Sequence, residues 1–320
     1  MSLVIVVLAA VDKMAEKRRY FTDDEISIVA NGYYTKTAKQ LAEELQCKPQ
    51  KINDTWKRLK LKGKEKNRLY HFNYNYFENI DCQEKAYWLG FIYADGCVYK
   101  RGDFQGLLTI GLNDKDLNIL ELFKHDIEAE YPINFRKSKY KNKEGYSTMA
   151  TLTLISDKIF NDLANYSCVP NKTFKIKEIP QIPKSLYRHF IRGYFDGDGS
   201  INKIKSKSQK QFSFSILGQK EFIEQIQEII NNELNIELLL YQDKRTENLY
   251  FTATSNKKYF AKIYSYLYDG ATRYMERKKE IFEEFFYLVL DEYSLLNIFE
   301  LNPKIILKEN PYWMKRKEVN

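Results

Sequence analysis

Hydrophobic residues recur with helical spacing in the first part of the chain, where three short helices are predicted. Thr22 and Glu25 have the spacing of a capping box, and the helix that they start should end near Gly32. A second helix is predicted from Thr37, and a third starts at Pro49, a residue suited to a first helical turn. The third helix would expose Gln50, Lys51, Asn53, Asp54, Lys57 and Arg58. The spacing predicts a helix-turn-helix DNA-binding domain over residues 14–68, and an ordinary three-helix bundle is the alternative because the turn lacks the usual glycine.

The rest of the chain contains an internal repeat. Residues 86–96 (AYWLGFIYADG) align without gaps with residues 189–199 (HFIRGYFDGDG). Strands at 107–112 and 212–217 and helices at 117–127 and 222–234 follow the two copies. Further strands are expected at 133–139, 149–155, 237–245 and 249–254, with closing helices at 159–166 and 259–268. The order αββαββα thus occurs twice and predicts an α+β fold of two pseudo-symmetric repeats, over residues 76–178 and 184–287, joined by an extended proline-containing linker.

Small residues lie one turn apart in each repeated helix, Gly90 with Ala94 and Gly193 with Gly197. Glycine within a helix costs about 1 kcal/mol relative to alanine, so its use at matching positions predicts that the two helices pack closely against each other. Bulky neighbours would then enter the two cores. Each helix ends at an Asp-Gly pair, and the glycine is expected to take the left-handed conformation that stops helices.

Two carboxylates, Asp95 and Asp198, therefore stand side by side at the ends of these helices. A helix C-terminus already carries partial negative charge, so a cation must compensate. All-oxygen ligands favour a hard divalent ion, Mg²⁺, for which Mn²⁺ could substitute, with water and phosphate oxygens completing the shell. For one copy alone, an ordinary Asp-Gly helix stop is the alternative interpretation. The recurrence of the same motif at the same place in two equivalent units argues against this alternative.

Composition adds little to this interpretation. The chain has 320 residues, a net charge of +8 and an apolar fraction of 44%, which allows two or three domains and a polyanionic partner. Its four cysteines and three histidines are scattered, so neither disulfides nor a zinc site is expected. Residues 3–10 are too short an apolar run to span a membrane, which makes the cytoplasm the default location. Residues 1–13 are expected to be a non-native extension, and 288–320 an extension of unknown role.

Both repeated segments resemble the LAGLIDADG motif, and residues 191–199 are the closer copy. The resemblance covers about residues 76–287 and includes the segments 169–174 and 269–278. It implies a pseudo-twofold monomer whose two saddle-shaped sheets follow the DNA major groove, with Asp95 and Asp198 as catalytic metal ligands. The first copy departs from the motif at Tyr93, where the motif has an aspartate and the second copy has Asp196. This position is not the metal ligand, so catalytic activity is still expected.

The family also implies basic or amide residues around the metals, and Asp114, Gln219, Lys158 and Lys257 occupy plausible positions, although solvated polar residues are the equally good alternative. Basic side chains that collect on the predicted strands and turns would neutralise DNA phosphates. They are Lys100, Arg101, Arg136, Lys137, Lys139, Lys141 and Lys143 in the first repeat, and Lys203, Lys205, Lys207, Lys210, Lys244 and Arg245 in the second.

The predicted function is that of a homing endonuclease, which cleaves both strands of a long asymmetric DNA target with divalent metal. The family resemblance implies 5′-phosphate ends and short 3′ overhangs. Two alternatives stay open: a transcriptional regulator that has the same fold and no cleavage, and a maturase that binds intron RNA. Action in an organelle or on behalf of a phage would also fit. An intein is not expected, because the chain begins with Met1 and ends with Glu318-Val319-Asn320.

Overall fold

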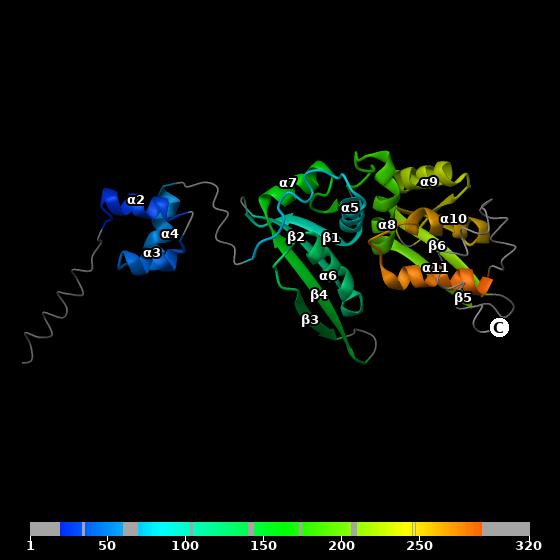
Figure 1. Ribbon diagram of the computed structural model, residues 1–320, viewed down its shortest axis with the longest axis horizontal. Coiled ribbons are helices and arrows are strands. Elements are labelled where there is room, and N and C mark those ends of the chain that lie inside the picture. The colour runs from blue at the N-terminus through cyan, green and yellow to red at the C-terminus, as the bar shows by residue number, and fades with distance from the viewer. Residues whose placement is uncertain are drawn as a thin grey trace, which may run out of the picture. The chain divides into compact units, whose positions relative to one another are not determined.

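The computed structural model describes residues 20–33, 36–59, 70–102, 105–139, 144–172, 175–205, 210–244, 246 and 248–289, without the side chains of residues 204, 205, 210 and 287–289. The chain divides into two compact units, residues 1–70 and 71–320, each of which is considered by itself (Figure 1). The extension expected at residues 1–13 and nearly all of that at 288–320 lie outside the described residues.

The first unit contains the three expected helices, α2 (Asp23–Asn31), α3 (Ala38–Glu44) and α4 (Pro49–Arg58). The predicted capping box of Thr22 and Glu25 is confirmed, and Thr37 forms a second one with Gln40. Val29, Leu41 and Ile52 are fully buried and bring one face of each helix into a small shared core. The helical prediction for this part of the chain is therefore confirmed.

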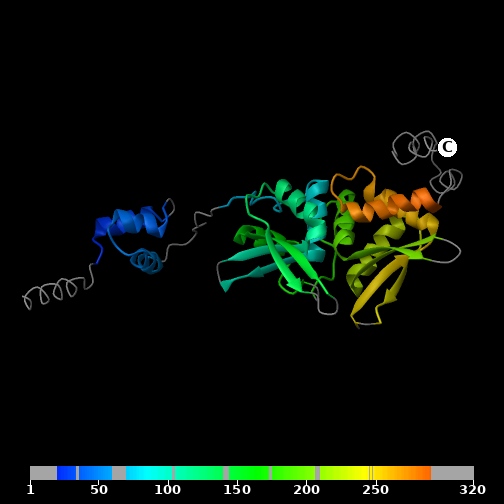
Figure 2. The same ribbon diagram turned by 90° about the horizontal axis from the view of Figure 1, so that it is seen from below.

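The second unit is α+β and contains the predicted repeat twice (Figures 1 and 2). The first copy is α5 (Gln83–Asp95), β1 (Gly96–Lys100), β2 (Gly106–Asn113), α6 (Leu117–Asp126), β3 (Asn134–Lys139), β4 (Tyr146–Ile155) and α7 (Asp157–Asn165). The second copy is α8 (Tyr187–Asp198), β5 (Gly199–Lys205), β6 (Lys210–Gln219), α9 (Lys220–Leu234), β7 (Leu239–Gln242), β8 (Leu249–Thr254) and α10 (Lys257–Tyr268). A further helix, α11 (Glu276–Val289), extends the second copy and was not anticipated.

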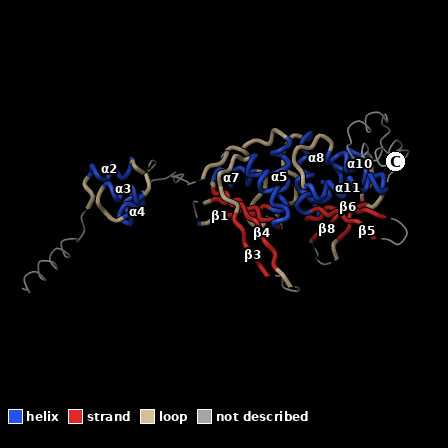
Figure 3. Tube along the Cα trace, turned by 60° about the horizontal axis from the view of Figure 1, so that its bottom comes forward, coloured by secondary structure: helices blue, strands red, loops and turns tan. Residues whose placement is uncertain are grey.

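Each copy forms one antiparallel sheet with the strand order first, second, fourth, third: β1-β2-β4-β3 and β5-β6-β8-β7. Buried Ala150, Leu152 and Leu154 alternate along β4 with Thr151 and Thr153, which keep part of their surface accessible. Helices cover the face of each sheet that carries the buried residues, and Figure 3 shows the two sheets along one side of the second unit. We refer to the other faces of the two sheets as the open faces.

Helices α5 and α8 pack against each other at the centre of this unit (Figure 1). A Cβ atom built on Gly90 would lie 2.0 Å from the carbonyl oxygen of Phe190, and one built on Gly193 would lie 1.9 Å from that of Tyr87. Neither backbone could come so close if these positions carried a side chain. The predicted stripe of small residues therefore joins the two repeats, and bulky neighbours such as Trp88 and Phe195 are buried as expected.

The glycines after the two aspartates are not in the left-handed conformation that the sequence suggested, so that prediction was wrong. Gly96 has φ −73° and ψ 142°, and Gly199 has φ −83° and ψ 158°, both extended. Each helix passes directly into a strand, and glycine is needed for space: a Cβ atom would lie 2.7 Å from the carbonyl oxygen of Ile92 at Gly96 and 2.4 Å from that of Phe195 at Gly199. No helix among the described residues is both long and apolar enough to cross a membrane.

Candidate active site at the ends of the paired helices

Asp95 and Asp198 are the last residues of α5 and α8, each at a junction between helix and strand. The close packing of the helices brings these ends together: a Cβ atom on Gly197, next to Asp198, would lie 2.2 Å from the Cβ atom of Ala94 and 3.3 Å from Oδ2 of Asp95. Both aspartates are also open to solvent. The two repeats thus present one carboxylate each to a common, accessible point.

The pKa values of the two carboxyl groups reflect this proximity. Closely packed protein atoms around Asp95 and the negative charge of Asp198 raise the pKa of Asp95 to about 6. The positive charges of Lys278 and Lys172 act in the opposite direction and lower this pKa. Protein atoms packed around the accessible Asp198 carboxyl group also raise its pKa by partial desolvation, although both lysines and a hydrogen bond with Tyr194 oppose the change. The negative charges of the two carboxylates repel each other, and a bound cation would relieve this repulsion.

Two buried lysines bind the backbone at the ends of the paired helices. The ammonium group of Lys172 donates to the carbonyl oxygens of Tyr93 at 2.6 Å and Ala94 at 2.7 Å. That of Lys278, on α11, donates to the carbonyl oxygens of Phe195 at 2.5 Å, Asp196 at 2.8 Å and Gly199 at 2.7 Å. Burial lowers the pKa of both amines, to about 8 for Lys278. The lysines offset the negative ends of both helices directly behind the carboxylates.

Sequence reasoning gave these lysines no role, although both lie in segments that carried the family resemblance. Lys172 is 79 residues from Tyr93 and Lys278 is 83 residues from Phe195 along the chain. No local pattern relates positions so far apart. The signal available was the equivalent location of both lysines, each after the last helix of the αββαββα order in its own repeat.

Asp196 is fully buried and joins the two repeats to α11. Its carboxylate accepts hydrogen bonds from the hydroxyl of Tyr87 at 2.9 Å, from the hydroxyl of Tyr268 at 3.3 Å and from the backbone amide of Met275 at 2.7 Å. At the matching position in the first repeat, Tyr93 packs its ring on Phe190 instead. The difference between the two motif copies is therefore a structural one: Asp196 holds the start of the helix that delivers Lys278.

The other predicted catalytic residues lie in different surroundings. Gln219 ends β6, and its amide nitrogen is buried without a hydrogen-bond partner. The ammonium group of Lys158 is paired with Glu78 at 2.9 Å and Asp162 at 3.0 Å. Lys257 is an exposed residue at the start of α10, and Asp114 is exposed in a short 3-10 helix. Among these four residues, only Gln219 has an unused donor at the end of a strand.

Strand pairing separates the basic residues that were expected to face DNA. Arg136 pairs with Met149 and lies on the open face, whereas Lys137 and Lys139 point to the side of buried Ala150. Lys203 forms an ion pair with Glu284 of α11, and Lys100 lies 4.8 Å from the ring centre of Phe160 on α7, so both face helices. Arg101 and Lys244 are exposed. Outside the described residues or side chains lie Lys141, Lys143, Lys205, Lys207, Lys210 and Arg245.

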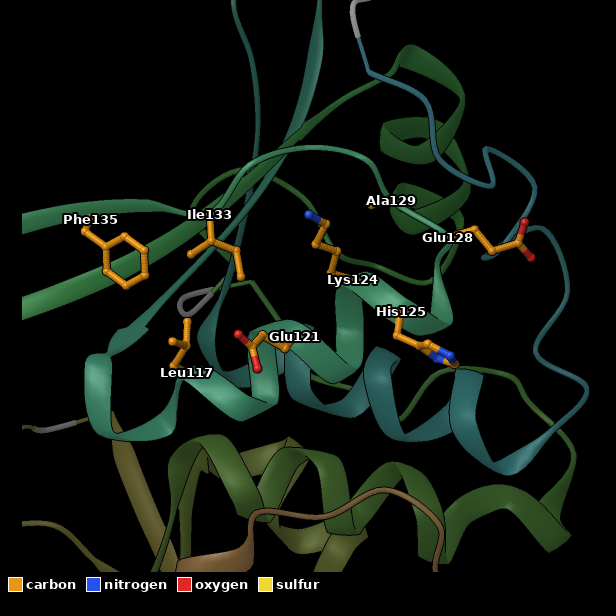
Figure 4. A pocket seen from close by; sticks show the side chains of 8 residues that line it. All are labelled: Leu117, Glu121, Lys124, His125, Glu128, Ala129, Ile133 and Phe135. Carbon is orange, nitrogen blue, oxygen red and sulfur yellow. The ribbon is translucent and has the colours of Figure 1, made fainter.

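No group of three or more His, Cys, Asp or Glu side chains that could hold a metal occurs among the described residues, so the two aspartates are an open pair rather than a closed metal site. A shallow apolar pocket lies elsewhere, between α6 and β3 of the first repeat, and contains none of the predicted site residues (Figure 4). Its lining residues are Leu117, Glu121, Lys124, His125, Glu128, Ala129, Ile133 and Phe135.

Comparisons with known proteins show what the second repeat is similar to. Residues 185–268 match the model of the LAGLIDADG-like domain. Among curated proteins, a segment of the tRNA-splicing ligase RtcB of Methanopyrus kandleri is 27% identical over 229 residues, and a segment of the DNA polymerase of Acanthamoeba polyphaga mimivirus is 26% identical over 201 residues. These matches cover 64% and 58% of this chain but only 22% and 10% of the two relatives.

Solved structures of similar architecture include the meganuclease I-SmaMI bound to uncleavable DNA, which aligns with 72% of this chain and 96% of its own, at 16% identity and a TM-score of 0.44. The LAGLIDADG homing endonuclease I-GzeII in complex with its DNA target aligns with 71% of this chain and 98% of its own, at 13% identity and a TM-score of 0.45.

Proposed function

We propose that this chain, whose residues 185–268 are a LAGLIDADG-like domain, is a DNA endonuclease that hydrolyses one phosphodiester bond in each strand of a long, asymmetric duplex target. The observation that carries this proposal is the convergence of Asp95 and Asp198 from two equivalent repeats. Two equivalent carboxylates suit a substrate with two equivalent reacting groups, and antiparallel DNA strands supply them. Mg²⁺, or Mn²⁺ in its place, is the proposed cofactor.

The residues present fit such a cation. Both carboxylates are accessible, both have raised pKa values, and no further carboxylate, thiolate or imidazole closes the site among the described residues. Hard divalent ions take oxygen ligands and keep some positions for water or phosphate, so Asp95 and Asp198 would hold the ion together with the DNA backbone. When bound, such an ion polarises the phosphate and activates water for attack.

The protein itself contributes placement and charge. Lys172 and Lys278 neutralise the helix ends, so the anionic pair stays close without unfolding that region. The amide nitrogen of Gln219 is buried without a protein partner, so DNA binding would have to expose this nitrogen before it donated to a phosphate oxygen. The open sheet faces, with Arg136 on the first, would follow the DNA groove, while the lysines that face helices contribute to affinity only through their long-range field.

The curated relatives support a role separate from the named activity of each host protein. A ligase and a polymerase have unrelated activities, yet each shares only a small part of its length with this chain: 22% and 10%. A segment found in such different proteins behaves as a portable module. We therefore propose that the segment belongs to a mobile genetic element and that its activity acts on DNA. A monomer would suffice for this activity, because both carboxylates are in one chain.

The DNA substrate is a duplex in which the sequences that flank the gene on its two sides are joined directly; this is the empty insertion site. The proteins tested are the unmodified chain and the variants Asp95→Asn and Asp198→Asn. Either change removes a ligand charge with little change of volume, so double-strand cleavage should be lost while binding and thermal stability persist. Asp162→Asn, which changes an aspartate in the ion pair with Lys158, is the matched control and should cut normally. Normal cutting by either site variant would refute the proposal. Binding without cutting by the unmodified protein would indicate a regulator, and selective binding of the intron RNA would indicate a maturase.

A further inference from the structure

We propose that residues 20–59 are a second DNA-reading unit, in which α4 enters the major groove and recognises adenine through Gln50 and Asn53. The inference deepens the proposed function, since it assumes that the partner of the whole chain is duplex DNA. It concerns the first compact unit, whereas the carboxylate pair belongs to the second. Three observations support it: the turn before α4, the separation of α4 into a buried side and an outward side, and the distribution of charge in this unit.

The turn between α3 and α4 forms without the glycine that such turns usually contain. Gln46 adopts φ +48°, the left-handed conformation that glycine usually supplies there, and the amide of Cys47 donates to the carbonyl oxygen of Ala42 at 2.8 Å. This bond closes α3, and the chain re-enters a helix at Pro49. Helix α4 thus follows α3 after a turn of a few residues, as in units that place their second helix in the major groove.

The inner side of α4 is committed to the core of this unit. Ile52 and Thr55 are buried, and the indole nitrogen of Trp56 donates to the carbonyl oxygen of Val29 at 2.8 Å. The ammonium group of Lys51 lies 4.0 Å from the centre of the Phe21 ring. These contacts set the rotation of α4 about its axis, so the residues that face outward are determined by packing. Lys51, which the sequence suggested as a DNA contact, packs on Phe21, and its role as a DNA contact stays a prediction.

The outward stripe of α4 is formed by Gln50, Asn53, Asp54 and Lys57, which follow one another at intervals of three and four residues. The side-chain nitrogen of Gln50 donates to Oδ1 of Asp54 at 3.0 Å, which orients the amide toward the outside of the helix. An asparagine or glutamine amide can form two hydrogen bonds with the major-groove edge of adenine. An RNA duplex would not admit the helix, because its major groove is deep and narrow.

Charge within the unit favours the same face. Helix α2 contains three acidic residues and no basic ones, whereas α4 contains Lys51, Lys57 and Arg58 against a single acid, Asp54. The sequence that follows α4, residues 60–68, adds five basic residues and one acid. Large exposed apolar side chains are absent from α4, so a protein partner that binds through a hydrophobic patch does not fit it. Phosphate contacts by Lys57 and Arg58 would place the helix, and the amides would select the base.

The experiment uses the full chain, with Ca²⁺ in place of Mg²⁺, and duplexes selected from a randomised DNA pool. Asn53→Ala and Gln50→Ala should each weaken binding about tenfold and shorten the protected footprint at one end only, while the cleavage positions measured in Mg²⁺ stay the same. Lys57→Ala should reduce affinity for all sequences and lower the salt dependence of binding by about one ion. Ser27→Ala, an exposed change on α2, is the control within the same unit.

Replacing adenine by 7-deazaadenine in the affected part of the footprint removes the N7 acceptor. This substitution should weaken the unmodified protein and have little further effect on Asn53→Ala or Gln50→Ala. Unchanged footprints in both amide variants, or equal losses with and without the N7 acceptor, would overturn the proposal. The measurement is independent of catalysis: a chain that never cuts DNA but loses one end of its footprint in these variants would refute the endonuclease and support the second reading unit.

Discussion

Replacing Gly193 by alanine should separate the two paired helices and so disable the active site. The added Cβ atom would lie 1.9 Å from the carbonyl oxygen of Tyr87 and 2.8 Å from the amide nitrogen of Phe91. Both neighbours are helix backbone, so no side chain can rotate out of the way. A carbon and an oxygen approach no closer than about 3 Å without strong repulsion, so the helices must move apart by about 1 Å.

The cost can be worked from this displacement. Alanine in place of glycine would by itself stabilise a helix by about 1 kcal/mol, while overpacking a core costs about 1–3 kcal/mol and more where only backbone can yield. A gap of about 1 Å also forfeits up to about half of the dispersion energy of the atom pairs across it, and this interface includes the buried rings of Tyr87, Phe91 and Phe190. We expect a net loss of about 2 kcal/mol in the free energy of unfolding.

The effect on cleavage should exceed the effect on folding. A displacement of about 1 Å at reacting groups can lower a rate about 100-fold, and the separation of Asp95 from Asp198 depends directly on this contact. The assay combines urea denaturation of the full chain with cleavage of the empty insertion site. In the urea denaturation, Gly111→Ala is the matched control, because its new Cβ atom would meet its nearest neighbour at an ordinary 3.5 Å. A Gly193→Ala protein as stable and active as the parent would refute the packing argument.

Three further predictions follow from the site. A target plasmid should be linearised in Mg²⁺ or Mn²⁺, bound but uncut in Ca²⁺, and rescued by excess Mg²⁺ after EDTA; efficient cutting in EDTA would exclude the two-carboxylate mechanism. Lys278→Met should lower stability by about 3 kcal/mol, because three carbonyl oxygens lose a charged donor, and should slow cutting more than Lys158→Met does in the same cleavage assay. Arg273→Met should cost about 2 kcal/mol at pH 7 by thermal denaturation and less at pH 3, since it leaves Asp126 without its main partner.

The acid dependence of that last effect has a definite sign. Burial alone would raise the pKa of Asp126, but hydrogen bonds from Arg273 and from the Trp88 indole outweigh it and hold the pKa below its ordinary value of 3.8. A carboxyl group with a depressed pKa stabilises the fold above that ordinary value, and the contribution is lost as pH falls through the folded-state pKa. Arg273 belongs to the second repeat and Asp126 to the first, so acid should weaken the junction between the repeats. A Tm difference between Arg273→Met and the parent that does not shrink with falling pH would contradict this reasoning.

The sequence predicted those parts of the fold that depend on local pattern. Helix and strand order in both repeats, the close contact at Gly90 and Gly193 and the pairing of Asp95 with Asp198 all follow from periodicity within one motif and its recurrence. The orientation of β3 did not follow, because alternation of Lys137 and Lys139 shows that they share a face without showing which one. Pairing with β4, whose register lies outside the local sequence, places them with Ala150 on the covered side.

The buried lysines explain how two carboxylates can stand at two helix C-termini at all. Each helix end carries partial negative charge, and each Asp adds a full one, so close packing of α5 and α8 concentrates repulsion at a single point. Lys172 and Lys278 bind the backbone carbonyls rather than the carboxylate oxygens, which leaves the carboxylates available outside. The lysines would thus compensate the partial negative charge of the helix ends. The negative charge of the two carboxylates would remain available to a cation on the accessible side. A pair of salt bridges to Asp95 and Asp198 would have stabilised the fold in the same place and abolished the site.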